Sequence, residues 1–215
     1  MRSIKYSEAI YEGFDQALGN IEDVFIIGQG LWSPWYVGST MTDLEKKYGK
    51  ERIIDSPISE NATTGIAIGA AMSGKKAIVV PPRMDFMLLA MDPLINQASN
   101  WSYLFNSEVP VPLVVRSIIN RGGEQGAQHS QALQSFFMHV PGMKVVMPAT
   151  PADAKGLLLG AINDPNPVMF IDDRWCYDAE GPVPIELEEI PLGTAEIMKT
   201  GDDITIVAFS YLVHE

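Results

Sequence analysis

Hydrophobic residues along the chain follow two alternating patterns, one typical of helices and the other of buried strands. In the first helical stretch, Ala9, Ile10, Gly13, Phe14 and Leu18 fall on one stripe at helical spacing. The helical stretches are 7–18, 42–49, 60–74, 86–105, 132–140 and 150–164. The stretches read as strands are mostly apolar without alternation, and they are 23–28, 52–58, 75–80, 111–119, 143–149 and 166–172. This order predicts an α/β fold: a parallel sheet with helices on both faces.

Proline and glycine add detail to two of the helical stretches. Pro93 lies inside the longest one, where it removes a backbone donor, so we expect a bend or a new helix there. Gly65 and Gly69 lie inside another, although glycine costs about 1 kcal/mol in a helix interior. We therefore expect a close backbone approach to that helix.

A change of composition after Tyr177 divides the chain. Residues 1–178 contain the alternating elements and are predicted to form one domain. Residues 179–195 are rich in proline and acidic side chains, so we expect a linker or an extended arm. Residues 196–215 include an apolar stretch, 204–209, which we expect to be the first strand of a further domain that is truncated or completed by a separate chain.

Charge and composition exclude several classes of protein. The 215 residues carry a net charge of −12, which would repel a nucleic acid. No apolar run approaches the roughly 20 residues that cross a bilayer, and the N-terminus lacks the apolar core of a secretory signal. The single cysteine, Cys176, cannot form an internal disulfide. We therefore expect a cytoplasmic protein that binds neither nucleic acid nor membrane.

Two polar clusters are the candidates for chemistry. The sequence has no nucleotide-binding glycine fingerprint and no G-x-S-x-G motif, and its three histidines are too scattered for a metal-ligand motif. Glu60 lies between Ser59 and Asn61 at the start of a helical stretch, where a carboxylate could simply stabilise the helix N-terminus. His129 lies in the glycine-rich loop 120–131, which could simply be a mobile polar turn. Both clusters follow predicted strands, and ligands bind beyond the carboxyl ends of parallel strands, so the two could converge.

The sequence around these clusters resembles a known family. Residues 55–74, DSPISENATTGIAIGAAMSG, are similar to the D-T-P-I-S-E-x-G-x-x-G-x-A-x-G-A-A-x-x-G pattern of beta subunits in pyruvate dehydrogenase-type 2-oxo acid decarboxylases. Residues 111–168, which contain GAQHS and PGMKVVMPATPADAKGLL, resemble the next block of that family. The resemblance implies a thiamine diphosphate-binding fold. In it, residues 1–178 are the transketolase-like pyrimidine-binding domain, and residues 196–215 begin a C-terminal domain of transketolase type.

The same resemblance implies roles for three residues. Glu60 matches the glutamate that hydrogen-bonds the N1′ nitrogen of the cofactor's aminopyrimidine and thereby activates the cofactor. We expect its carboxyl group to be partly desolvated and to share a proton near neutral pH. His129 matches a histidine that binds the 2-oxo acid and assists acyl transfer, and Phe86 matches an aromatic residue that stacks on the aminopyrimidine.

A potassium ion and further subunits are also implied by the resemblance. The backbone carbonyls of the family's potassium site match Leu113, Ala161, Ile162, Asp164 and Asn166. The chain lacks the family's G-D-G…N-N motif, so an alpha subunit is expected to bring the diphosphate and magnesium in an α2β2 heterotetramer. The acyl group would then pass to a lipoyl carrier on a lipoyl acyltransferase.

The chain departs from the family pattern near the expected site. The departures in one segment are Val80, Pro81, Pro82, Arg83, Leu89 and Pro93. Arg83 is a candidate contact for an anion or a substrate, and equally a surface residue. In GQGLWSPWYVGST, Trp32, Trp35 and Tyr36 could mark an altered entrance or interface. These departures leave the substrate open.

Three functions are compatible with the sequence. The first is the beta subunit of a thiamine diphosphate-dependent 2-oxo acid dehydrogenase, an oxidoreductase, and the GAQHS block favours it. The second is half of a split transketolase-like or deoxyxylulose-synthase-like transferase. The third is a non-catalytic assembly or regulatory module.

Overall fold

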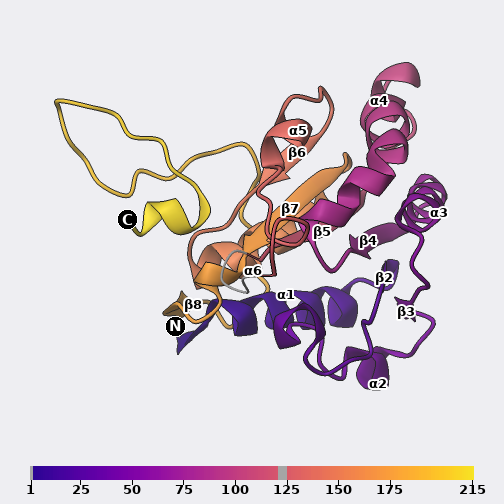
Figure 1. Cartoon of the computed structure of the whole chain (residues 1–215), viewed down its shortest axis with the longest axis horizontal. Helices are drawn as coiled ribbons and strands as arrows, with labels where there is room; N and C mark the ends of the chain where they lie inside the picture. The colour runs from indigo at the N-terminus through magenta and orange to yellow at the C-terminus, as the bar shows by residue number, and fades with distance from the viewer. Residues whose placement is uncertain (1, 121–124) are drawn as a thin grey trace.

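A six-stranded parallel sheet forms the centre of the protein (Figure 1). The structure is a computed structural model that describes residues 2–120 and 125–215. The sheet has the order β3-β2-β4-β5-β7-β6, and every neighbouring pair is parallel. Its strands are β2 (Val24–Gly28), β3 (Ile53–Asp55), β4 (Lys76–Val80), β5 (Leu113–Ile119), β6 (Lys144–Val146) and β7 (Val168–Asp173). Each strand lies at one of the apolar stretches of the sequence, so the predicted parallel sheet is confirmed.

Helices cover both faces of this sheet, as predicted (Figure 1). On one face α1 (Tyr6–Asn20) packs against α6 (Pro151–Asn163), and their apolar stripes share a core with the sheet. The other face carries α3 (Glu60–Met72), the 3₁₀-helix η2 (Met84–Ala90), the π-helix η3 (Pro93–Ala98), α4 (Ser99–Leu104) and α5 (Gln134–Met138). Pro93 begins η3, so the longest helical stretch is divided at the proline, as expected from its missing backbone donor.

A short 3₁₀-helix and a short α-helix lie between β2 and β3, and they are η1 (Tyr36–Ser39) and α2 (Leu44–Tyr48). Gly49 ends α2 in a conformation with a φ of 88°, which favours glycine. The helix starts at Leu44, later than Thr42, and the Thr42 hydroxyl donates to the backbone carbonyl of Pro34 at 2.8 Å.

The segment expected as a linker takes part in the fold. Within it, β8 (Glu180–Val183) pairs with β1 (Arg2–Lys5) in an antiparallel, two-stranded sheet. Further along, the buried Lys155 ammonium on α6 donates to the carbonyls of Pro184 at 2.7 Å and Glu186 at 2.8 Å. Residues 180–186 are therefore attached to the domain along its α1–α6 face.

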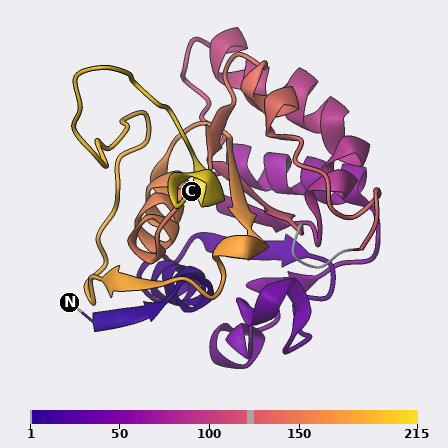
Figure 2. The same cartoon turned by 60° about the vertical axis from the view of Figure 1, so that its left-hand side comes forward.

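The strand expected over residues 204–209 is not formed. These residues have no regular structure, and the 3₁₀-helix η6 (Ser210–Val213) follows them. A strand is stable only when a neighbouring strand satisfies its backbone groups, and none of the described residues pairs with this segment. Figure 2 shows the yellow segment looping away from the sheet before η6 returns to it. There the Tyr211 ring meets Trp175 at 5.0 Å.

A buried ion pair connects two central strands. Arg116 on β5 donates from Nε and Nη2 to the carboxylate of Asp172 on β7, at 3.0 and 2.8 Å. Its Nη1 donates to the Thr40 hydroxyl at 2.7 Å, and the Tyr177 hydroxyl donates to Asp172. Burial is the main cause that holds the pKa of Tyr177 well above its usual range, and the nearby negative charge of Asp172 is the second. The phenol therefore keeps its proton and remains a donor to the carboxylate.

The direction in which the chain crosses the sheet reverses between β2 and β4. From β2 the chain moves to β3 at one edge, and β4 then lies on the opposite side of β2. Gly28 ends β2 beside Val80, the last residue of β4. A Cβ at Gly28 would lie 2.2 Å from the Val80 carbonyl oxygen, so glycine is required for the close approach here. Among the described residues, no helix is both long and apolar enough to cross a membrane.

Candidate functional site

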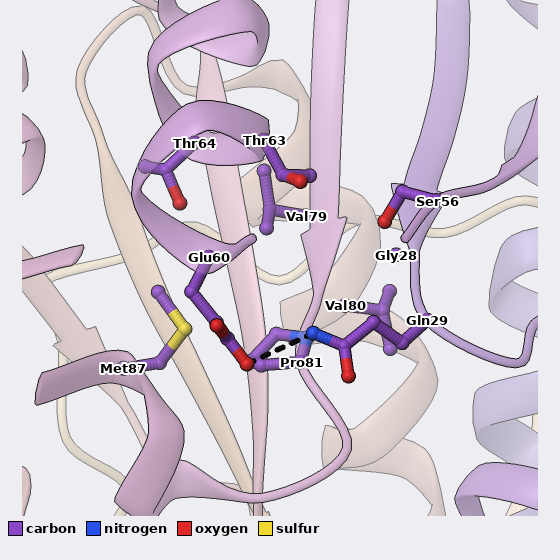
Figure 3. Close-up of a pocket in the computed structure, with 10 residues that line it drawn as sticks. All are labelled: Gly28, Gln29, Ser56, Glu60, Thr63, Thr64, Val79, Val80, Pro81 and Met87. Atoms are coloured by element: carbon purple, nitrogen blue, oxygen red, sulfur yellow. Dashed lines mark hydrogen bonds between the residues drawn. The ribbon is translucent and has the colours of Figure 1, made fainter. Parts of the chain in front are cut away.

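A pocket lies at the carboxyl ends of β2 and β4, where the strand order of the sheet reverses (Figure 3). Open α/β sheets bind ligands at such a reversal. The lining residues come from these strand ends, the turn after β3, the first two turns of α3, and η2. They are Gly28, Gln29, Ser56, Glu60, Thr63, Thr64, Val79, Val80, Pro81 and Met87.

Glu60 places its carboxylate in this pocket. It is the first residue of α3, directly after the N-cap Ser59, and only 8% of it is exposed. Its Oε1 accepts a hydrogen bond from the Gln29 amide, Nε2, at 2.8 Å (Figure 3). The helix N-terminus favours a carboxylate at this position. The stabilising role left open from the sequence is therefore compatible with a role in binding, because the same carboxylate faces a pocket.

The remaining pocket walls suit a flat ring with a polar edge. Val79, Val80, Pro81 and Met87 form apolar surface, and Val80 stands where the family pattern has a glutamate. The hydroxyl of Thr64 is buried, and no described residue hydrogen-bonds to it. A buried polar atom without a partner is costly, so this hydroxyl is suited to contact a ligand. The carboxylate, the hydroxyl and the apolar walls together fit an aminopyrimidine ring.

The sequence-predicted Phe86 and His129 lie next to each other. Their ring centroids are 5.2 Å apart and their planes meet at 84°, an edge-to-face contact. Neither lines the pocket, but Met87, the neighbour of Phe86 on η2, does. The structure thus connects the histidine to the pocket through η2. It shows Phe86 against an imidazole, whereas stacking of Phe86 on a cofactor ring stays a prediction.

Hydrogen bonds from η2 hold the histidine loop in place. The Asp85 carboxylate is 7% exposed and accepts from the backbone and side-chain amides of Gln131, at 3.3 and 2.9 Å. The Leu133 amide lies 3.3 Å from the sulfur of Met84. Both contacts are made by loop residues that follow His129, so η2 fixes the loop on the carboxyl side of the imidazole. Residues 121–124 of the predicted loop lie outside the described residues.

The residues expected to bind potassium lie in another part of the molecule. Leu113 opens β5 at the amino end of the sheet, and the other four are at the end of α6 and in the turn before β7: Ala161, Ile162, Asp164 and Asn166. The Lys76 ammonium donates to the Ile162 carbonyl at 3.2 Å, so a cation already contacts one of the five carbonyls. Potassium binding at this corner stays a prediction.

Sequence reasoning found the charged group of the pocket but missed its neighbours. Glu60 was predicted, whereas Gln29, Thr64 and Met87 were not. For Gln29 a signal existed, because it directly follows β2 and therefore lies at a carboxyl strand end. Segment 28–40 departs from the family pattern and contains several aromatic residues. Of these, Trp32 donates from Nε1 to the Ile53 carbonyl at 2.9 Å, and Trp35 is exposed.

Comparison with known proteins gives consistent matches. The family model "Transketolase, pyrimidine binding domain" matches residues 2–178. The beta subunit of acetoin:2,6-dichlorophenolindophenol oxidoreductase from Cupriavidus necator is 37% identical over 228 residues, which cover 99% of this chain and 66% of the relative. The pyruvate dehydrogenase E1 component subunit beta of Cyanidium caldarium is 40% identical, covering 94% and 62%. The 2-oxoisovalerate dehydrogenase subunit beta of Bacillus subtilis is 34% identical, covering 100% and 66%.

A solved structure shares the fold. It is described as a split gene transketolase, inactive beta4 tetramer, and it matches with a TM-score of 0.75 at 19% identity, covering 98% of this chain and 64% of that one. At this identity the match shows the fold alone. The chain spans about 66% of the length of the first two curated relatives.

Proposed function

Because the chain belongs to the transketolase pyrimidine-binding domain family, we propose that it is the beta-type component of a thiamine diphosphate-dependent 2-oxo acid dehydrogenase. The names of the curated relatives support this reading over a transferase or a non-catalytic module. The observation that carries the proposal is the buried Glu60 carboxylate in a pocket at the sheet reversal. That position matches the family's glutamate toward the pyrimidine nitrogen.

In this proposal Glu60 holds a proton against the N1′ nitrogen of the cofactor ring. Gln29 holds Oε1 at 2.8 Å, which leaves Oε2 to face a ligand. The apolar walls of Val80 and Met87 keep water from the ring and strengthen the hydrogen bond. When bound, thiamine diphosphate supplies the carbon that attacks the 2-oxo acid. The chain's contribution is to place the ring and to hold or release a proton at the carboxyl group.

His129 has the second role in the proposal. Imidazole exchanges a proton near neutral pH, so it can donate to a 2-oxo acid or accept from it. The edge of one ring against the face of the other in the Phe86–His129 pair restricts the orientation of the imidazole, and the Asp85–Gln131 contacts restrict its loop. An imidazole that is already held in one orientation loses less conformational entropy when substrate binds.

A partner chain completes the site in this proposal. The exposed face of α3 carries Gly65 and Gly69, and a Cβ at either would meet no atom from elsewhere in the described part of the chain within 4 Å. The fold itself therefore does not explain two destabilising glycines in a helix, whereas close packing of a second backbone would. Beside them Ile66 is 63% exposed. We propose that this face contacts an alpha subunit, which brings the diphosphate and magnesium in an α2β2 assembly, and that a lipoyl acyltransferase receives the acyl group.

Replacement of Glu60 tests the proposal directly. In the complex with a co-expressed alpha subunit, Glu60→Gln keeps the shape and a hydrogen bond but cannot exchange the proton. Turnover of a 2-oxo acid is expected to fall by a factor of about 100 or more, the usual contribution of a proton-transferring group. Affinity for thiamine diphosphate, measured by calorimetry, should change only a few-fold.

Glu22→Gln is the matched control, since Glu22 is exposed in the turn before β2 at the other end of the sheet. It should behave as wild type. Unchanged turnover in Glu60→Gln would contradict the proposed role.

A further inference from the structure

Three N–H donors from two side chains converge on one oxygen at the carboxyl ends of β4 and β5. Arg83 donates from Nε at 3.1 Å and from Nη2 at 2.7 Å to Oε1 of Gln125. Asn120 donates to the same oxygen from Nδ2 at 2.9 Å. One oxygen with three donors is an arrangement suited to an anion, because each donor contributes positive potential at the same point.

The fold holds Asn120 in place, whereas Gln125 lies on an exposed loop. Asn120 follows β5 and is fully buried. Its Oδ1 accepts from Nη1 of Arg174, which follows β7, at 2.8 Å, so its amide donor is turned toward Gln125. Gln125 is an exposed side chain on the polar loop. A ligand oxygen can therefore take the place of the Gln125 oxygen without rearrangement of the core.

The ligand chemistry follows from the donors. The edge of a guanidinium formed by Nε and Nη2 binds the two oxygens of a carboxylate or a phosphate in a fork. Gln125 offers these donors a neutral amide oxygen, and hydrogen bonds between charged groups are about twice as strong. A carboxylate or phosphate should therefore displace Gln125.

This position adjoins the histidine. The Phe86 amide donates to the Arg83 carbonyl at 3.3 Å, so both belong to one turn at the start of η2, and Phe86 contacts His129. We propose that Arg83 and Asn120 form an anion subsite for the substrate, with Gln125 as a displaceable internal acceptor. The identity of the substrate as a 2-oxo acid rests on the proposed function. The bound group is either its own carboxylate or a second anionic group.

Binding to the chain alone tests the subsite without cofactor or partner. Side-chain N–H signals are followed by NMR during titration with pyruvate, 2-oxoglutarate and inorganic phosphate. The Arg83 Nε–H signal, assigned by its loss in Arg83→Gln, is expected to shift saturably. A shift with both oxo acids assigns the subsite to the carboxylate they share, and a shift with 2-oxoglutarate alone assigns it to the second anionic group. A shift with phosphate alone would mean an adventitious ion only, and that result, or no shift at all, would overturn the proposal.

Two substitutions of Gln125 give opposite expectations. Gln125→Ala removes the internal acceptor, so the oxo acid should bind more tightly than to wild type. Gln125→Glu places a permanent carboxylate on the three donors, so binding should weaken by a factor of about 10 or more. Both change an exposed side chain and should leave folding intact. Equal affinities in the two variants would contradict a displaceable acceptor.

The assembled enzyme provides the functional readout. Arg83→Gln is expected to raise the KM for the 2-oxo acid by a factor of about 10 with a smaller change in kcat, because a binding contact is lost. Arg2→Gln removes the same charge on β1 and should leave both constants unchanged. If the chain binds oxo acids but Glu60→Gln is fully active, only the proposed function fails. If Glu60→Gln is inactive but no anion binds, only the subsite fails.

Discussion

At the scale of single residues, the pocket pairs an acid with an amide. The Gln29 side chain now donates its N–H to Glu60, and after a rotation its carbonyl could accept from a protonated carboxyl group. A glutamine can therefore stabilise Glu60 in both protonation states without carrying a charge. In the proposed function this makes Gln29 a positioning residue that acts through Glu60.

Substitution of Gln29 by leucine tests this role. Gln29→Leu should lower kcat in the assembled enzyme by a factor of about 10, because a hydrogen bond to a charged group is lost. Gln97→Leu, at an exposed glutamine of η3, is the control. An unchanged kcat in Gln29→Leu would contradict this role.

The sequence alone could not identify this partner. The resemblance singled out Glu60, because a motif of twenty residues surrounds it. Gln29 lies 31 positions earlier, and the contact exists only because β2 and α3 meet at the sheet reversal. The same limit applies to Asp85, whose contact with Gln131 spans 46 positions. Local patterns identify residues with a shared motif, whereas side-chain partners depend on how the elements pack.

At the scale of elements, β5 and β7 share a buried charge pair inside a mostly apolar sheet. The stretch 111–119 was predicted as a buried strand because it is mostly apolar without alternation, and that prediction is confirmed. Its one charged residue, Arg116, is fully buried against Asp172. The prediction of a strand over residues 204–209 was wrong. These residues have strand propensity, but the described part of the chain gives them no neighbouring strand.

Removal of one partner of the buried pair should destabilise the protein strongly. Arg116→Met leaves the Asp172 charge buried without its ion-pair partner, and the free energy of unfolding should fall by about 3–5 kcal/mol. Combining it with Asp172→Leu should restore part of that loss, because no unpaired charge remains. Lys46→Met, which removes the exposed pair with Asp43, should leave the free energy of unfolding nearly unchanged, because water screens that pair. Urea unfolding measures all three, and a small loss in Arg116→Met would contradict the argument.

At the scale of the whole molecule, the chain presents a domain with one face that its own contacts do not explain. The α/β class and the order of elements were predictable because each element has its own apolar pattern. The use of the α3 face was not predictable from the sequence, because in the proposed assembly the residues that pack against its glycines belong to another chain. In the proposed assembly, these glycines lower the free energy of unfolding of the isolated chain but allow a partner to pack closely against α3.

This exchange has a measurable consequence. The double substitution Gly65→Ala and Gly69→Ala should raise the free energy of unfolding of the isolated chain by up to about 1 kcal/mol per site. The same variant should assemble more weakly with the alpha subunit, as measured by analytical ultracentrifugation. Gly201→Ala lies outside the helices and also has open space around it, so it should change neither quantity. Unimpaired assembly of the double variant would rule out a close contact through this face.

The burial of Cys176 in the core beneath α1 and α6 makes the chain convenient for spectroscopy. A buried thiol reacts slowly, and the sequence contains no other cysteine. A cysteine introduced at Ser73, exposed at the end of α3, would then be the single attachment point for a spin label or a fluorophore. Distances from such a probe would report the approach of a second chain without any background signal.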